Sequence, residues 1–566
     1  MPAVFPAWCR FYGDVPPTIE YPECSTYEAV HATAARYPDA VALEFLGVTT
    51  TYRELVRQID QASGALAALG LAARDRLVVA LPTSPQAVVA YYAANSLGAV
   101  PVMVHPLSTA AEIESYAQSS GAGIALALDA LYHRFIRSLE HGALQTLVLT
   151  RLSDALPYLK RLAFRLTRGR GIPKVPADAR VRWWDKLLAR GHPDPPPHVR
   201  DLDAPSTILF SGGTTGAPKG IMLSDRNIVS NGLQTARWVG MRVEDRVLAA
   251  LPLFHGFGLS TLVNAPLMCG CRVILVPEFS PEAVARVIRR SRPNFIAGVP
   301  SLYQALAGHA GLRGTDLSCI RAAFSGGDTL PPPVKQRFDQ MLLEGGSSAR
   351  LLEGYGLTEN VTSVTVMPLH LERAGSVGIP LPDTLVAIRE PEADHELPPD
   401  QAGEICVSGP AVMLGYLNDP VTTGAVLRRH DGRIWLHTGD IGRQDGDGFL
   451  YFLGRRKRMI KSSGFNVFPG EVEQVLCTHP AVAEAHVLGV PDERRGERVK
   501  AYVVPRAPAA TPALANELIE HCRGRLIKWS CPREIEFRPE LPKNRVGKVD
   551  QRALLEGASD AGSTSP

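Results

Sequence analysis

A chain of 566 residues is longer than one hydrophobic core usually supports, so we expect at least two domains. Its 60 lysines and arginines nearly balance its 57 aspartates and glutamates, and the net charge of +3 argues against a protein that binds nucleic acid through its overall charge. The nine cysteines are scattered and odd in number, which favours neither a disulfide framework nor a cysteine-based zinc site and points to the reducing cytoplasm.

The N-terminal part of the chain alternates strand patterns with helix patterns. It has no signal-peptide-like apolar region, and the longest apolar stretch, near residues 77–107, is broken by Pro82, Asn95 and Pro101, so we expect no membrane span. The predicted strands are 77–81, 99–104, 271–276 and 294–299, and the predicted helices are 84–97, 281–291 and 301–307. This alternation predicts largely parallel sheets covered by helices.

An apolar strand that begins at residue 207 runs into a loop suited to holding phosphate. Backbone N–H groups can turn toward an anion where glycines allow it, and hydroxyls and one lysine add donors and charge. The residues concerned are Ser211, Gly212, Gly213, Thr214, Thr215, Gly216 and Lys219. The loop is not a Walker A motif, because Pro218 precedes the lysine and Gly220 follows it. The alternative is a solvent-exposed loop rich in turn residues.

The pattern changes after residue 380. Short runs separated by proline and glycine predict a β-rich subdomain at about 380–453. Beyond it we expect helices at 469–477 and 512–526 and strands at 485–488 and 499–504, in a separate small α+β domain. The last residues, 557–566, have almost nothing to bury, which predicts a disordered tail.

Seven segments resemble, in order, the motifs of the AMP-forming acyl-CoA synthetase superfamily. The loop is followed by Leu-Pro-Leu-Phe-His-Gly-Phe-Gly at 251–258, Ser-Gly-Gly at 325–327, Glu-Gly-Tyr-Gly-Leu-Thr-Glu at 353–359, His-Thr-Gly-Asp at 437–440, and further segments at 454–465 and 542–549. Segments 15–22 and 49–55 are similar to bacterial long-chain fatty acid CoA ligases in particular. The resemblance covers nearly the whole chain.

The resemblance implies a fold and a reaction. It implies a large N-terminal domain of helix-covered sheets at 1–453, a hinge at 454–460 and a small mobile α+β lid at 461–556. The implied reaction joins a fatty acid to ATP with Mg²⁺, which gives acyl-AMP and pyrophosphate. CoA then displaces AMP to give acyl-CoA.

The same resemblance assigns roles to individual residues. Lys548 is the catalytic lysine of the lid; its alternative is a solvated surface lysine. Glu359 holds Mg²⁺ with the loop hydroxyl of Thr214; its alternative is an ordinary carboxylate at the start of a helix. The nucleotide is held by a larger set, namely the loop residues with Gly326, Gly327, Gly354, Tyr355, Gly356, Thr358, Asp440, Arg455 and Lys548. Asp440 accepts hydrogen bonds from the ribose hydroxyls.

The remaining assignments concern the second half-reaction. His255, Ser463 and Gly464 lie where the CoA thiol arrives, although a core-packed histidine is the alternative for His255. Arg458 is the hinge residue and departs from the acidic residue usual there. Ser463 replaces a second lysine of coumarate ligases and luciferases, which disfavours luciferase-type oxygenation.

The sequence also restricts which kind of acid can be the substrate, and it leaves several other functions possible. The Phe254-His255 segment offers no anion for an α-ammonium group, so the substrate should lack one. A fatty acyl-AMP ligase that loads an acyl carrier protein shares every adenylation motif. An aryl or coumarate-type CoA ligase and a non-catalytic binding protein for acyl adenylate or acyl-CoA also remain open.

A basic stretch at 158–190 could give the enzyme a peripheral contact with an anionic membrane at the inner face. Its cationic residues alternate with apolar ones that include Trp183 and Trp184. The alternative is a solvated charged face whose tryptophans pack on the main domain.

Overall fold

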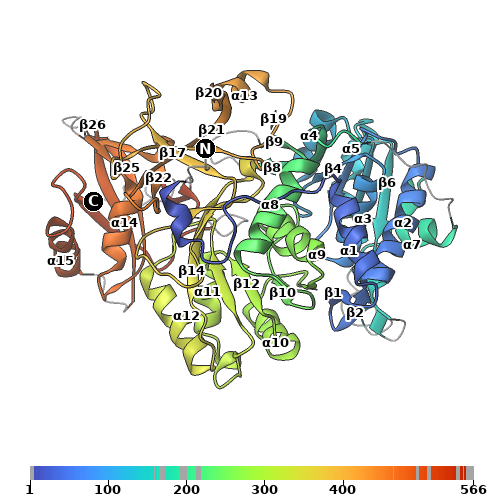
Figure 1. Cartoon of the computed structure of the whole chain (residues 1–566), viewed down its shortest axis with the longest axis horizontal. Helices are drawn as coiled ribbons and strands as arrows, with labels where there is room; N and C mark the ends of the chain where they lie inside the picture. Colours follow the sequence, from blue (N-terminus) through green and yellow to red (C-terminus); the bar gives the residue numbers. More distant parts are fainter. Residues whose placement is uncertain are drawn as a thin grey trace, which may run out of the picture.

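The computed structural model describes residues 6–157, 160–161, 164, 172–191, 200–211, 218–462, 465–492, 496–506, 511–543, 549–551 and 553–555. These residues form a large α/β body and a smaller C-terminal α+β part, which lies at one end of the molecule in Figure 1. The fold class expected from the sequence is therefore confirmed. The predicted tail at 557–566 lies outside the described residues.

One sheet of the large body is mostly parallel. Its order is β19-β9-β8-β4-β3-β5-β6-β7, and β9 and β19 are the antiparallel members. The strands are β3 (Arg76–Ala80), β4 (Val100–Met103), β5 (Ile124–Leu128), β6 (Thr146–Thr150), β7 (Val181–Trp183), β8 (Pro205–Ser211), β9 (Lys219–Ser224) and β19 (Gly415–Tyr416).

A second sheet has parallel central strands and antiparallel edges. Its order is β16-β15-β14-β13-β12-β10-β11-β1-β2. The strands are β1 (Val41–Phe45), β2 (Val48–Thr51), β10 (Arg246–Ala249), β11 (Arg272–Leu275), β12 (Phe295–Gly298), β13 (Ala322–Ser325), β14 (Leu351–Gly356), β15 (Ser363–Val366) and β16 (Ile379–Pro380).

A layer of helices packs between these two sheets and shares one hydrophobic core with both. The layer contains α1 (Thr26–Arg36), α2 (Tyr52–Ala68), α3 (Pro85–Ser96), α7 (Trp184–Ala189), α8 (Asp225–Trp238) and α9 (Ala265–Met268). The helix α3 is buried on nearly all sides, because its sequence is apolar or small all round. Capping boxes at Ser25 and Thr51 set the starts of α1 and α2.

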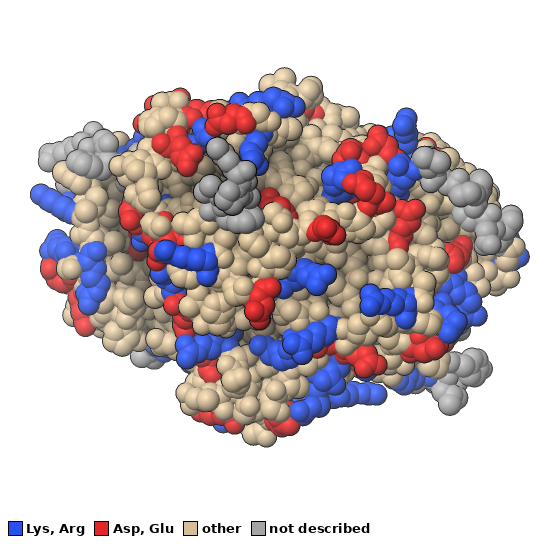
Figure 2. All heavy atoms as spheres, viewed as in Figure 1, with Lys and Arg blue, Asp and Glu red and all other residues tan. Residues whose placement is uncertain are grey.

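Other helices cover the outer faces of the two sheets and complete their cores. These helices are α4 (Ala110–Ser120), α5 (Ile136–Glu140), α10 (Pro281–Ser291), α11 (Pro300–Ala307) and α12 (Pro332–Glu344). A proline in the first turn fixes the start of α10, α11 and α12. On the face of the molecule in Figure 2, acidic and basic side chains are interspersed, as the near balance of charges implies.

The segment predicted to be β-rich forms an antiparallel sheet. Its order is β17-β18-β21-β20, with β22 paired to β21, and α13 (Pro420–Val426) precedes β20. The strands are β17 (Leu385–Arg389), β18 (Gly403–Ser408), β20 (Leu427–His430), β21 (Arg433–Gln444) and β22 (Leu450–Arg455).

The C-terminal part has a sheet and a core of its own. It contains β23 (Ile460–Ser462), β24 (Phe465–Val467), α14 (Pro469–Cys477), β25 (Val482–Asp492), β26 (Gly496–Pro505), α15 (Pro512–Arg523) and β27 (Glu534–Phe537). The helix α14 packs against β22 and α12 of the large body. The exact domain limits stay predictions. Among the described helices, none combines the length and the apolar composition that crossing a membrane requires.

Candidate active site

The predicted glycine-rich segments meet at the carboxyl ends of neighbouring parallel strands. Residues 326–327 follow β13, and the Gly326 N–H donates to Gly298 O at the end of β12, at 3.0 Å. A Cβ on Gly326 would lie 3.2 Å from Gly354 O and 3.5 Å from the Phe257 ring. Gly327 has φ +83°, which glycine adopts without strain. This sheet edge is where open α/β folds bind ligands.

The predicted phosphate loop begins and ends on paired strands of the other sheet. Ser211 at the end of β8 lies opposite Lys219 at the start of β9. The loop between them, with Gly212, Gly213, Thr214, Thr215 and Gly216, lies outside the described residues. The hairpin register therefore places the hydroxyl and the lysine at the two ends of the loop.

Two residues predicted to hold the nucleotide, Tyr355 and Arg455, each lie against a third, Asp440. The Tyr355 hydroxyl donates a 2.8 Å hydrogen bond to Asp440 Oδ2, and Arg455 Nε lies 3.7 Å from Asp440 Oδ1. Burial, with the charge of Asp440, raises the pKa of Tyr355 well above its ordinary value, so the phenol stays a proton donor. The Tyr355 ring stacks on Phe452 at 5.9 Å between centroids. Asp440 and Arg455 are register partners on β21 and β22.

Glu359 is held by a residue that the sequence did not single out. The Tyr416 hydroxyl donates to Glu359 Oε1 at 3.0 Å, and Lys219 Nζ lies 4.8 Å from the centre of the Tyr416 ring. Glu359 sits in a single 3₁₀ turn, Thr358–Asn360, not at the start of a long helix. Tyr416 reaches it because β19 pairs with β9, a contact between segments about 200 residues apart in sequence.

Val361, which follows Glu359 by two residues and has a strained backbone, packs against the segment that contains His255. Val361 is buried with φ +58°, which is rare for a β-branched residue. A Cβ on Gly256 would lie 2.1 Å from Val361 O, so only glycine allows the two backbones to approach this closely. His255 is exposed, and its Nδ1 accepts the Phe257 N–H at 3.2 Å. The alternative of a core-packed histidine therefore does not hold.

Arg458, the predicted hinge residue, is bound to the C-terminal part. It lies in the 3₁₀ turn Arg456–Arg458, and one of its guanidinium nitrogens is 3.0 Å from Glu473 Oε1 on α14 and 3.2 Å from His486 Nε2 on β25. Burial raises the pKa of Glu473 despite the nearby arginine. Burial, with the charge of Arg458, lowers the pKa of His486 to about 3, so this histidine is neutral at ordinary pH.

Three residues predicted to act in the reaction belong to the C-terminal part but are not described by the structure. Ser463, Gly464 and Lys548 lie outside the described residues. The flanking Lys543 pairs with Val549 in a β-bridge, and its Nζ lies 3.0 Å from Glu484 Oε1.

The tryptophans of the basic stretch pack on the domain. Trp184 is buried in the core between the two large sheets, and the Arg151 guanidinium lies 3.9 Å from the Trp183 ring centre. Neither ring projects freely toward solvent. This agrees with the alternative given for this stretch, in which these two tryptophans pack on the main domain.

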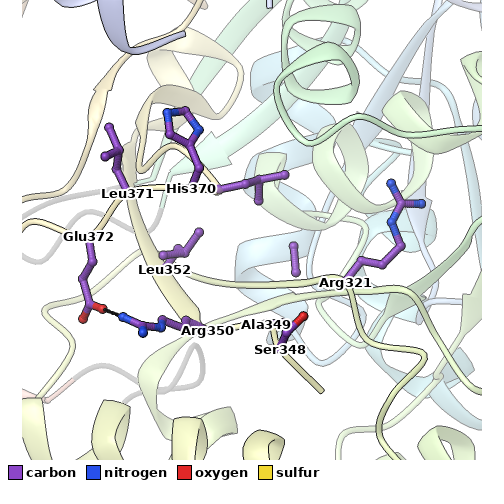
Figure 3. A pocket seen from close by; sticks show the side chains of 10 residues that line it. Arg321, Ser348, Ala349, Arg350, Leu352, His370, Leu371 and Glu372 are labelled. Atoms are coloured by element: carbon purple, nitrogen blue, oxygen red, sulfur yellow. Dashed lines mark hydrogen bonds and ion pairs between the residues drawn. The ribbon is translucent and has the colours of Figure 1, made fainter. Parts of the chain in front are cut away.

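A pocket of about 390 Å³ lies apart from the predicted site residues. Its lining includes Arg321, Arg350 and Glu372, and Figure 3 shows the ion pair between the last two. It lies at the amino ends of β13 and β14, where Ala322 and Leu352 contribute to the wall. The predicted site residues lie at the opposite, carboxyl ends of these strands.

Replacing Tyr416 with phenylalanine tests how much the held carboxylate matters. The loss of one hydrogen bond to a charged group corresponds to about 1.5 kcal/mol, or roughly tenfold. If Glu359 holds Mg²⁺ in an ATP-dependent reaction, as the sequence predicts, the Mg²⁺ concentration for half-maximal pyrophosphate release should rise by about that factor, measured by titrating Mg²⁺ at saturating ATP. An unchanged Mg²⁺ requirement would contradict a role for Tyr416 in positioning Glu359.

Comparison with known proteins gives a consistent set of relatives. Residues 30–417 match the family described as AMP-binding enzyme, and residues 471–548 match its C-terminal domain. A long-chain-fatty-acid–CoA ligase of Bacillus subtilis is 35% identical over 97% of both chains. A feruloyl-CoA synthase of Amycolatopsis is 33% identical over 90% of this chain and 94% of its own. The ATP-bound MatB of Rhodopseudomonas palustris has a TM-score of 0.81 at 27% identity, over 95% and 100% of the two chains.

Proposed function

Because the chain belongs to the AMP-binding enzyme family and is an ATP-dependent acyl-CoA ligase, we propose that its acid is a long-chain fatty acid and that the residues gathered here activate it. The observation that carries the site is that Tyr355 and Arg455 both lie against Asp440 at the carboxyl edge of the sheet. The substrate class rests on the full-length similarity to long-chain-fatty-acid–CoA ligases.

In the first half-reaction a carboxylate oxygen attacks the α-phosphorus of ATP and pyrophosphate leaves. Two anions must approach, so cationic donors have to offset their repulsion. We assign this task to Lys548 and place Lys219 and the loop hydroxyls against the phosphates. The buried carboxylate of Asp440 accepts from the ribose hydroxyls, while Tyr355 and Arg455 fix its orientation. In the second half-reaction the CoA thiolate attacks the acyl carbon and AMP leaves.

The residues around Glu359 fit a magnesium ion. Its carboxylate supplies hard oxygen, Tyr416 fixes Oε1, and Oε2 has no hydrogen bond within the described part of the chain. Glu359 and Thr214 would hold the ion. When bound, Mg²⁺ neutralises charge on the phosphates.

A panel of acids tests the proposed substrate. Palmitate, octanoate, acetate and ferulate are each supplied with ATP, Mg²⁺ and CoA, and AMP, pyrophosphate and thioester are measured. We expect kcat/KM to be highest for palmitate. A preference for ferulate would favour an aryl-acid ligase, as the name of the feruloyl-CoA synthase relative suggests, and turnover only with acyl carrier protein would favour a carrier-loading ligase. No turnover with any acid would favour a binding protein.

The CoA step has its own predicted variant. We place Gly464 on the lid surface that faces pantetheine, so a leucine side chain there should obstruct the thiol path. Gly464→Leu should slow transfer of supplied acyl adenylate to CoA by roughly 100-fold while adenylation, followed by pyrophosphate release, changes little. The smaller Gly464→Ala is the matched control. Full transfer activity in the leucine variant would refute this placement, which also includes His255 and Ser463.

The proposal includes a hinge at Arg458. If the lid rotates about this residue, the ion pair between Arg458 and Glu473 moves with the lid, because both residues belong to it.

The proposal also includes a peripheral contact with anionic lipid. This contact would depend on the cationic side chains of 158–190, since Trp183 and Trp184 are packed on the domain.

A further inference from the structure

Three metal-ligand side chains converge on the antiparallel sheet, and one of them lies on β21, the strand that also carries Asp440. Asp394 lies between β17 and β18, His430 ends β20, and His437 lies within β21. One ligand atom of each lies within 4.8 Å of those of the other two. His430 Nε2 is 3.1 Å from Asp394 Oδ2, and His437 Nε2 is 3.5 Å from Asp394 Oδ1.

The facing atoms are buried and unsatisfied. Nε2 of His430, Nε2 of His437 and Oδ1 of Asp394 make no hydrogen bond within the described residues. The His437 side chain is only 4% exposed. Each buried polar atom left without a partner costs about 1–3 kcal/mol, so a ligand shared by these three atoms would remove that cost.

The contacts of His437 Nδ1 determine whether its other ring nitrogen, Nε2, can bind a metal ion. Its Nδ1 lies 3.1 Å from Glu404 Oε2 and 3.4 Å from Cys406 Sγ. When Nδ1 donates to the Glu404 carboxylate, the neutral imidazole keeps its lone pair on Nε2, the nitrogen on the side of Asp394. A carboxylate behind a histidine in this way is the usual support of a metal-binding imidazole.

We propose that Asp394, His430 and His437 form a binding site for a divalent first-row transition metal ion, with Zn²⁺ the best match. Tetrahedral zinc with bonds of about 2.0–2.1 Å needs ligand atoms about 3.3 Å apart. His430 Nε2 lies 3.1 Å from Asp394 Oδ2 and His437 Nε2 lies 3.5 Å from Asp394 Oδ1, so each imidazole is near that spacing from its own oxygen of the carboxylate. Two imidazoles favour zinc over magnesium, which separates this site from the one at Glu359. Asp394 and His430 are 22% and 23% exposed, which leaves an entry path and room for water as a fourth ligand.

Two arginines already lie against Asp394. Arg389 Nη1 lies 3.9 Å from Asp394 Oδ1 and donates to the Asp394 carbonyl oxygen at 2.9 Å, and this side chain is only 7% exposed. An Arg428 guanidinium nitrogen lies 3.2 Å from Asp394 Oδ2. This side chain is 39% exposed, so its ion pair is of the kind that contributes little and can be displaced. Removing Arg428 should therefore strengthen metal binding.

Titration with Co²⁺ tests the proposal, because Co²⁺ binds at zinc sites and its visible absorption reports on its ligands. The full-length protein is treated with chelator and titrated with Co²⁺ without ATP or Mg²⁺. We expect one Co²⁺ per chain with the intense absorption of a four- or five-coordinate nitrogen site, and its displacement by Zn²⁺. His430→Gln and Asp394→Asn should bind at least about tenfold more weakly, Glu404→Gln about 10–100-fold more weakly, and Arg428→Gln more tightly.

The matched control is His395→Gln, an exposed histidine 3.3 Å from Glu390, which should bind Co²⁺ as the unchanged protein does. Circular dichroism without metal checks that each variant is folded. Zn²⁺ should raise the Tm of the unchanged protein and not that of His430→Gln. The proposal is overturned if Co²⁺ gives no such absorption, or if His430→Gln and Asp394→Asn bind it like the unchanged protein.

Discussion

Replacing Lys548 with alanine should slow acyl-adenylate formation by roughly 100-fold or more, the effect expected when one preorganised charge-stabilising donor is removed. The measurement is single-turnover pyrophosphate release with a saturating acid and ATP. Transfer of supplied acyl adenylate to CoA should fall much less, because that step does not bring two anions together.

The matched control for this variant is Lys543→Ala. Lys543 pairs with Glu484 on the same domain, and removing such a partly exposed ion pair costs at most about 1 kcal/mol. It should leave adenylation nearly unchanged. If Lys548→Ala slows thioester formation as much as adenylation, the role assigned to Lys548 is wrong.

Replacing Asp440 with alanine should lower kcat/KM for ATP by roughly 100-fold. Two hydrogen bonds from ribose hydroxyls to a buried carboxylate would be lost, at about 1.5 kcal/mol each. The loss should appear mainly as a higher KM for ATP, with the KM for the fatty acid little changed. Initial rates at varied ATP and at varied acid provide the measurement.

The variant Tyr355→Phe separates the ribose contact from the internal hydrogen bond. It removes the 2.8 Å bond to Asp440 and keeps the carboxylate. We expect no more than about a tenfold loss from removing this single bond. Equal losses in both variants would mean that Asp440 acts by holding Tyr355, and the ribose assignment would fail.

Several helices could be predicted from the sequence, because the local pattern of apolar and polar residues matches the side of each helix that is buried. The predicted helix 281–291 matches α10, and the predicted helix 469–477 matches α14. The predicted strand 485–488 was too short, since β25 runs from Val482 to Asp492 through polar and half-buried residues that lack a strong apolar signal. The predicted helix 512–526 ends earlier, at Arg523, where Gly524 follows.

The contacts that shape the site could not be predicted from local pattern. Tyr416 meets Glu359 only because a short strand pairs across a large gap in sequence. The positive φ of Val361 occurs where its carbonyl oxygen approaches Gly256 closely, a contact between segments far apart in sequence. The cluster of Asp394, His430 and His437 draws on three segments, none of which carries a metal-binding spacing.

The central claim is that the acid is activated as an acyl adenylate, and oxygen transfer tests it most directly. Palmitate labelled with ¹⁸O in both carboxylate oxygens is turned over with ATP, Mg²⁺ and CoA, and the phosphorus products are analysed by mass spectrometry. One carboxylate oxygen should remain on phosphorus after the thiolate displaces AMP. We therefore predict one ¹⁸O atom in each AMP and none in pyrophosphate. Unlabelled AMP alongside thioester formation, or label in pyrophosphate or phosphate, would contradict the account.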